Sequence, residues 1–273
     1  MPSDGRAPLM ERLLVLRLET LGVAAEASLN GVPLARASAR GGAVTVPIHE
    51  YTSSGANRLS LVVEPPPPGG VAAPQPLLSN GQRGASLRLL LPRIGQIAHP
   101  ENARTLAQID WAPLAGEVTE LPHTLEQAVD LPIAFPRWRW LDAPPVPDVP
   151  ALLGHAASYL QGLALGLLKG DIEPLVLAAR VRFEELAQAY QRNLADDVAR
   201  FKQEMQALHA AQPLQPAMPK ADALLLRPLA GGRLLECLRP DGEPLLQSPT
   251  AGGGRVMWPL RLAVIEGRFY VVR

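Results

Sequence analysis

The spacing of apolar residues changes twice along the chain, and this change limits the possible fold more than any other feature. Across 12–64 and 85–141 apolar residues recur at every second position, which is the spacing of half-buried strands. Across 150–211 they recur at i, i+3 and i+4, which is the spacing of amphipathic helices. Across 222–273 the period of two returns. The sequence therefore predicts strands, then helices, then strands again.

The first half is expected to hold about eight short strands. The segment RLLVLRLE places Leu14, Leu16 and Leu18 on one face of the first of them. Asn30-Gly31 is a strong signal for a two-residue hairpin, because both positions of such a turn need positive φ. The segment PRWRWL, residues 136–141, is predicted to be the last strand. Many short strands with turns between them are typical of a β-sandwich.

A proline-rich segment, DAPPVPDVP at 142–150, comes after these strands and is interpreted as a linker. We expect a β-sandwich domain over 1–145 and an α+β domain over 146–273. In the second domain three helices are predicted to pack on an antiparallel curved sheet of about four strands. Gly170 is expected to end the first helix, Asp171 to cap the second and Asn193 to cap the third.

The N-terminal half resembles sandwich modules of the galactose-binding or immunoglobulin-like type. The resemblance is carried by ASLNGVPLA and by VPIHEYTSSGANRLSLVV, in which Gly55, Asn57 and Leu59 form a Gly-x-Asn-x-Leu turn into a core strand. It covers about sixty residues. The acidic and aromatic loop residues of sugar-binding members have no match here, so the resemblance implies the fold and no ligand.

The C-terminal half is similar to the nuclear transport factor 2-like fold, also called cystatin-like. The segment GDIEPLVLAARVRFEELAQAY looks like the family's helix after a Gly-Asp turn, and WPLRLAVIEGRFYVVR looks like its two closing strands. The family covers isomerases, dehydratases and non-catalytic binding or assembly domains, so the fold does not determine the function. No catalytic motif of the family can be matched position by position.

Composition argues against several classes of function. Lys plus Arg and Asp plus Glu number 26 each, whereas a nucleic-acid-binding protein usually carries an excess of basic residues. Cys237 is the only cysteine, which excludes an internal disulfide and a cysteine-based zinc site. It lies on a predicted strand beside Glu236, and a neighbouring carboxylate raises the pKa of a thiol, so we expect this thiol to be inert. No stretch reads as a signal peptide or a membrane span. We expect a cytoplasmic protein, and the abundance of Ala, Leu, Arg, Pro and Gly is typical of a bacterial genome.

Few residues are candidates for catalysis. His155 lies near the apolar stripe of the first predicted helix, where it is either a general base facing a cavity or a boundary histidine. Tyr190 is either a ligand contact or a core residue with its hydroxyl at the rim. Asp171 and Glu173 are explained as a helix cap and a complement to the helix dipole. No metal site and no cofactor are expected.

Trp138 and Trp140 form the most conspicuous aromatic pair of the chain. On a strand their rings would share one face, and an exposed pair could stack on sugars or bases. The interpretation we favour is that they lie at the seam between the two domains and close a core there.

The function expected from the sequence is that of a non-enzymatic binding or assembly protein of unknown partner or ligand. The alternatives are a small-molecule isomerase or hydrolase that uses a pocket in the C-terminal domain, with His155 and Tyr190 as its groups, and a carbohydrate-binding accessory protein. A homodimer through the C-terminal sheet is a further expectation, because sheets of this family often pair.

Overall fold

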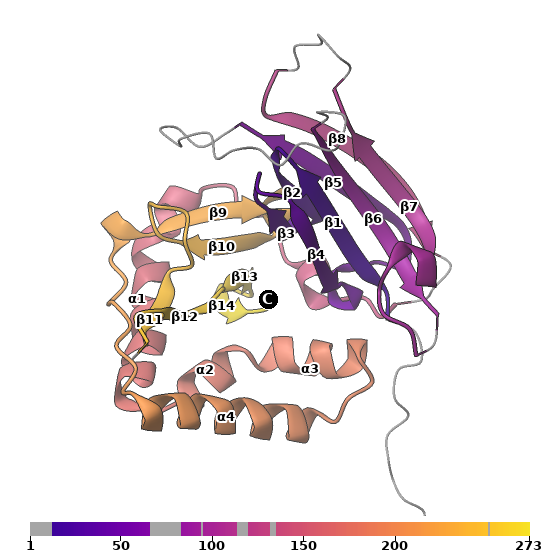
Figure 1. The fold of residues 1–273 in the computed structure, drawn as a ribbon. Coiled ribbons are helices and arrows are strands. Elements are labelled where there is room, and N and C mark those ends of the chain that lie inside the picture. The colour runs from indigo at the N-terminus through magenta and orange to yellow at the C-terminus, as the bar shows by residue number, and fades with distance from the viewer. Residues whose placement is uncertain (1–12, 66–82, 94, 114–119, 132–134, 251) are drawn as a thin grey trace, which may run out of the picture. The chain divides into compact units, whose positions relative to one another are not determined.

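The computed structural model describes residues 13–65, 83–93, 95–113, 120–131, 135–250 and 252–273. It contains many antiparallel strands, arranged in sheets, together with four helices (Figure 1). The described residues fall into two compact units, an N-terminal unit that ends at Arg137 and a C-terminal unit that begins at Trp138. The domain ranges 1–145 and 146–273 stay a prediction.

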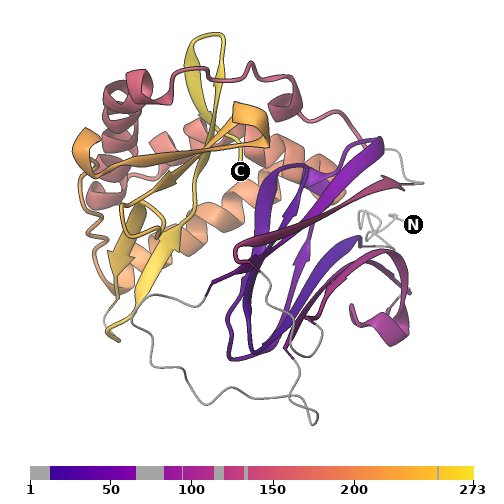
Figure 2. The same cartoon turned by 90° about the horizontal axis from the view of Figure 1, so that it is seen from above.

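The N-terminal unit consists of two four-stranded antiparallel sheets, with strand orders β4-β1-β6-β7 and β3-β2-β5-β8. The strands are β1 (Val15–Leu21), β2 (Ala24–Leu29), β3 (Val32–Ala37), β4 (Gly42–Pro47), β5 (Gly55–Glu64), β6 (Gly84–Pro92), β7 (Ala103–Trp111) and β8 (His123–Leu131). Alternate leucines of β1 and β6 share one apolar core with those of β5, so each sheet contributes one face to it. This alternation is what the period of two predicts. Figure 2 shows the strands of this unit in indigo to magenta.

The Asn30-Gly31 hairpin is confirmed. The two residues have φ of 53° and 74°, and they join β2 to β3 with Leu29 opposite Val32. The Asn30 side chain also donates to the carboxamide oxygen of Asn57 at 2.8 Å. The hairpin is therefore tied by side-chain hydrogen bonds to the start of β5.

The C-terminal unit begins with helices and ends with strands, in the predicted order. Its helices are α1 (Val149–Lys169), α2 (Glu173–Ala178), α3 (Arg180–Ala189) and α4 (Leu194–Ala211). The second predicted helix is thus two, because the backbone at Ala179 leaves the helical region with ψ of 12°. Neither proline nor glycine stands at Ala179, and the apolar period continues through it, so the pattern did not reveal the break.

Six strands come after the helices, where about four were predicted. They are β9 (Leu225–Leu229), β10 (Leu234–Leu238), β11 (Leu246–Pro249), β12 (Arg255–Trp258), β13 (Arg261–Ile265) and β14 (Arg268–Val271). They form a sheet with order β14-β13-β10-β9 and a separate β11-β12 hairpin. Pro259 lies between β12 and β13 and lacks the backbone donor that a continuous strand would need, which explains the additional break.

The prediction of a strand over residues 136–141 is wrong. Residues Arg139–Asp142 form a short 3-10 helix, in which the Leu141 amide donates to the Trp138 carbonyl at 3.1 Å. The Arg139 amide donates at 2.6 Å to the carboxylate of Glu185 instead of to a neighbouring strand. The segment is thus held by a side chain of α3 and has no place in a sheet.

The apolar side of α1 supplies much of the core of the C-terminal unit. Leu160, Leu163 and Leu167 pack there with leucines of the sheet, and Cys237 is buried among them. By length and composition, α1 is the one helix of the described residues that could cross a membrane. Of its most apolar window 39% is buried inside the protein.

Candidate functional site

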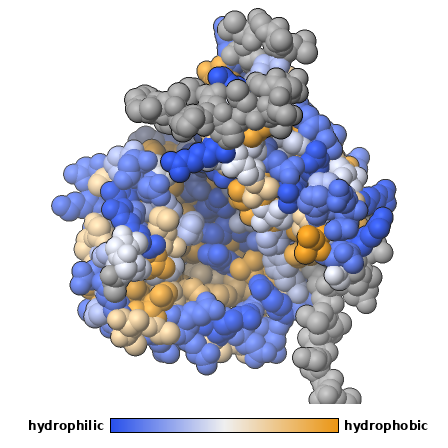
Figure 3. Space-filling view, in the orientation of Figure 1, coloured by the Kyte–Doolittle hydropathy of each residue, from blue (hydrophilic) through white to orange (hydrophobic). Residues whose placement is uncertain are grey.

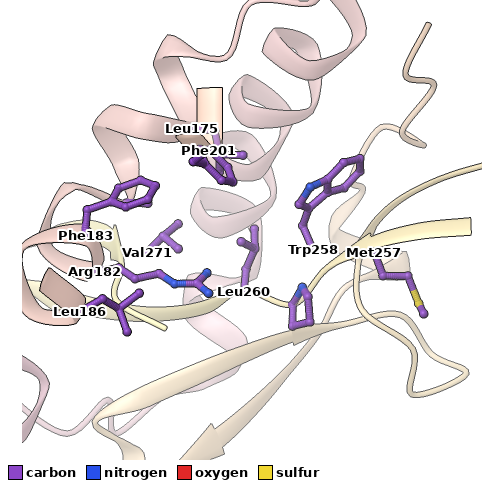
Figure 4. Close-up of a pocket in the computed structure, with 11 residues that line it drawn as sticks. Leu175, Arg182, Phe183, Leu186, Phe201, Met257, Trp258, Leu260 and Val271 are labelled. Carbon is purple, nitrogen blue, oxygen red and sulfur yellow. The ribbon is translucent and has the colours of Figure 1, made fainter. Parts of the chain in front are cut away.

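The C-terminal unit contains an apolar cavity of about 240 Å³ that opens to solvent (Figure 4). Helices α2, α3 and α4 form one side of it, and β12, β14 and the segment Pro259–Leu260 form the other. The lining residues are Leu175, Ala179, Arg182, Phe183, Leu186, Phe201, Met257, Trp258, Pro259, Leu260 and Val271. The space-filling view shows hydrophobic and hydrophilic side chains side by side on this face of the C-terminal unit (Figure 3). Such a cavity is suited to an apolar group of a small molecule.

A tight turn between α1 and α2 determines where the helical side of the cavity begins. Gly170 ends α1 with φ of 72°, and its amide donates to the Leu167 carbonyl at 3.1 Å. A Cβ on Gly166 would lie 2.7 Å from the Asp171 carbonyl oxygen, so only glycine permits this close return of the chain. The turn directs α2 across the sheet, which brings Leu175 to the cavity wall.

Aromatic contacts hold the two longer helices of the cavity together. The rings of Phe183 on α3 and Phe201 on α4 meet edge to face, with centroids 5.3 Å apart. The Trp258 indole donates to the sulfur of Met205 at 3.3 Å. These contacts join α3 to α4 and α4 to β12. Because the cavity walls are held by contacts within the chain, the cavity is expected to exist before a ligand arrives.

Arg182 is the only ionisable residue among those that line this cavity. In Figure 4 its side chain extends along the cavity toward Leu260. The Arg182 guanidinium has an interaction within the chain, so an anionic ligand would share it with that partner. Its planar donors match the two oxygens of a carboxylate. The chemistry of the site is thus apolar with a single cationic group.

A second, smaller hollow of about 120 Å³ adjoins the first and shares Phe183, Leu186 and Phe201 with it. Asp197 is 8% exposed there. Its carboxylate pairs with Arg192 at 3.0 Å and with Arg200. Glu204 also lines this hollow, so its two arginines and two carboxylates balance in charge.

The two residues predicted for catalysis lie elsewhere. His155 is exposed on the outside of α1, and Tyr190 caps the C-terminal end of α3 with the Arg192 guanidinium 5.2 Å from its ring centre. Neither lines either hollow. The interpretation of His155 as a base that faces a cavity is therefore at odds with its place on the helix, whereas Tyr190 lies half-buried at a helix end.

Asp171 and Glu173 lie at the start of α2, as expected, but the N-cap of this helix is Ile172 and not Asp171. Asp171 accepts a hydrogen bond from the Glu173 amide at 3.1 Å, and Glu173 pairs with Lys202 of α4 at 2.6 Å. Among the described residues no cluster of three or more His, Cys, Asp or Glu side chains could hold a metal ion.

Trp138 and Trp140 are not an open stacking platform. They are 0% and 1% exposed, so neither ring offers a free face to a sugar or a base. Trp140 lies 6.0 Å from the guanidinium carbon of Arg273, which pairs at 2.6 Å with Glu185. The aromatic pair therefore carries no ligand site in this structure.

Cys237 is buried, and burial together with the neighbouring Glu236 raises the pKa of its thiol. Burial also raises the pKa of Tyr159 to about 12, with smaller contributions from Cys237 and Tyr270. Both side chains stay protonated at neutral pH. A thiol that is not ionised is a poor nucleophile, in line with the inert cysteine expected from the sequence.

Sequence reasoning missed Arg182 because it searched for converging acids and bases. The available signal was a charged residue between Val181 and Phe183, beside the apolar stripe of the predicted helix.

No family model matches the chain, and neither the curated proteins nor the solved structures contain a significant match to it.

Proposed function

We propose that this chain is a non-enzymatic binding protein whose C-terminal unit takes a small apolar molecule with one anionic group. The observation that carries the proposal is the composition of the cavity wall, which is apolar apart from Arg182. An apolar group would occupy the space between Phe183, Trp258 and Leu260, and a carboxylate would meet the guanidinium.

The proposal includes two finer statements about the fold. The two sheets with a shared core support a β-sandwich as the N-terminal domain. Four helices that precede a four-stranded antiparallel sheet, with a cavity between them, support a nuclear transport factor 2-like C-terminal domain. In that reading the cavity lies where domains of this type leave room between helices and sheet.

The other functions considered from the sequence have less support. An isomerase or hydrolase would need acid or base groups at the cavity, and His155 and Tyr190 do not line it. A carbohydrate-binding protein would need exposed aromatic rings, and Trp138 and Trp140 are buried. The proposed location in the cytoplasm and the proposed absence of nucleic-acid and membrane partners rest on the sequence alone.

The experiment is a pair of calorimetric titrations with 2-naphthoate and with 2-naphthalenemethanol, which share a ring system and differ in charge. We expect naphthoate to bind more tightly by about tenfold or more, since a hydrogen bond to a charged group contributes about 1.5–3 kcal/mol. Arg182→Gln should remove this preference and leave the binding of the neutral alcohol unchanged.

The matched control is Arg180→Gln, because Arg180 lies on the same helix, is 62% exposed and does not line the cavity. It should bind both probes as the unaltered chain does. If Arg180→Gln and Arg182→Gln have equal effects, the anion does not meet Arg182. If neither probe binds at millimolar concentration, the cavity is not a site for such molecules.

A further inference from the structure

The outside of α1 is a mostly exposed surface without charged side chains in the described structure, although Gln161 at its edge donates to the Pro219 carbonyl at 2.7 Å. Between Val149 and Leu168 the helix has no Asp, Glu, Lys or Arg. Leu165 and Leu168 on this side are 44% and 43% exposed. The exposed residues, named here the α1 outer face, are Ala151, Gly154, His155, Ser158, Gln161, Gly162, Leu165 and Leu168. An uncharged exposed face of this length is unusual, since the solvent side of a surface helix normally carries charges.

Gly154 and Gly162 lie on this face, and no contact among the described residues requires a glycine at either position. A Cβ on Gly154 or Gly162 would meet nothing within 4 Å, whereas a Cβ on Gly166 would collide with the chain. Glycine inside an exposed helix costs about 1 kcal/mol relative to alanine. Small residues at helix surfaces allow the backbone of a second helix to approach closely. The glycines are therefore explained if another helix packs on this face.

The pattern is symmetric about Ser158, and this symmetry identifies the second helix. Gly154 and Gly162 lie four residues on either side of Ser158. Asp148, which caps the helix, and Lys169, its last residue, lie ten and eleven residues away, and both are exposed. A twofold contact must be complementary to itself. In an antiparallel pair each Asp148 would approach Lys169 of the second copy, whereas a parallel pair would place like charges together.

We propose that two copies of this chain associate through their α1 outer faces, antiparallel, with the Ser158 residues facing each other at the twofold axis. The uncharged centre avoids repulsion between identical surfaces, and the opposite charges at the ends fix the direction. A helix of 21 residues is about 30 Å long, so the contact belongs to the small class of interfaces. The dimer is accordingly weak, with dissociation in the micromolar range.

The first test is sedimentation velocity of the full chain between about 1 and 200 µM, a range set by the small interface. The mean mass should rise from 29.2 kDa toward twice that value. Ser158→Glu would place two like charges at the axis and should keep the chain monomeric throughout. Ser158→Ala, and Gln206→Glu on the exposed side of α4, should associate as the unaltered chain does.

Three results would overturn the proposal. The unaltered chain could stay monomeric at 200 µM, or Ser158→Glu could dimerise fully, which would instead agree with the sheet contact expected from the sequence. The chain could also remain monomeric in solution and float with phosphatidylcholine vesicles, which would make the α1 outer face a membrane contact. Circular dichroism of Ser158→Glu should match the unaltered chain, because position 158 is exposed.

The second test determines the direction of the pair by oxidative cross-linking. Ser158→Cys should form a disulfide-linked dimer, because the two residues meet at the axis. Leu168→Cys should cross-link at least tenfold less, because its two copies would lie about 30 Å apart. Cys237 is buried, so the unaltered chain provides the uncross-linked reference. Equal cross-linking of the two variants would overturn the antiparallel arrangement.

Discussion

At the scale of single residues, the buried side-chain amide of Asn57 organises the loop before β5. Its oxygen accepts from the Ser53 amide and from Asn30, both at 2.8 Å. Its nitrogen donates to the carbonyls of Ser53 and Gly55 at 2.9 Å and 2.8 Å. The Gly-x-Asn-x-Leu segment is thus explained by hydrogen bonds that close a loop, with no need for a ligand.

Asn57→Ala should lower the free energy of unfolding by about 2–4 kcal/mol, because it leaves several buried polar groups without partners. Ser53→Ala is the control, since it removes only a hydroxyl at the edge of the same loop and should cost less than about 1 kcal/mol. Urea denaturation measures both. Equal losses would mean that the Asn57 amide is not what holds the loop.

The raised pKa values of Cys237 and Tyr159 predict a loss of stability at alkaline pH. Each group is neutral in the folded chain at a pH where the unfolded chain would already have released its proton. The unfolded state is therefore favoured as the pH rises from about 9 toward 12, and no such effect operates below pH 8.

Tyr159→Phe tests this directly. The Tyr159 hydroxyl is buried without a hydrogen-bond partner among the described residues, so the variant should be equally stable or up to about 1 kcal/mol more stable at pH 7. Its stability should also fall less steeply above pH 10. A loss of stability at pH 7 would show that the hydroxyl has a partner.

At the scale of elements, the glycines of α1 separate into two kinds. Gly166→Ala should destabilise the chain by about 1–3 kcal/mol, because the new methyl group would lie 2.7 Å from the Asp171 carbonyl oxygen. Gly162→Ala should stabilise the monomer by about 0.5–1 kcal/mol, because the position is open and helical. Thermal unfolding at about 1 µM protein, below the dimer range, measures both. Opposite signs are expected, and equal signs would contradict the account.

The order of elements was predictable from the sequence because the apolar period differs between strands and helices. The turns at Asn30-Gly31, Gly231-Gly232 and Glu266-Gly267 were predictable because positive φ restricts the residue type, and all three show it. The break at Ala179 and the 3-10 helix at Arg139 were not. The first has no turn residue, and the second depends on Glu185, which lies 46 residues away.

The candidate site was less predictable than the fold. A cavity is the space that side chains leave, and Leu175, Phe201 and Trp258 come together only after the helices have packed on the strands. The sequence left two alternatives open for His155 for a similar reason. His155 borders the apolar stripe of α1 in the sequence. Because the exposed face of this helix also lacks charged residues, the spacing of apolar residues does not distinguish the buried face from the exposed one.

At the scale of the whole molecule, the segment before α1 belongs structurally with the C-terminal unit. The Arg139 amide donates to Glu185, its guanidinium donates to Glu184 at 2.6 Å, and the Val146 amide donates to the Gly232 carbonyl at 2.9 Å. A fragment of residues 138–273 should therefore fold by itself. A fragment of residues 146–273 should be less stable by about 2–4 kcal/mol, since the buried Glu185 carboxylate loses the Arg139 amide and keeps only Arg273.

Guanidinium denaturation of the two fragments measures the difference. Equal stability would show that residues 138–145 contribute nothing to the stability of the C-terminal unit. A further comparison with Glu185→Gln in the longer fragment identifies the cause, because this change weakens the contacts to Arg139 and Arg273 without removing the segment.

The central claim is that an apolar cavity with one cation, Arg182, binds a small anionic apolar molecule. The most direct test is a crystal structure of the chain grown with 2-naphthoate. The account predicts the ring system between Phe183, Trp258 and Leu260, with the carboxylate at the Arg182 guanidinium. A cavity closed by its own side chains, or naphthoate bound only elsewhere, would contradict it.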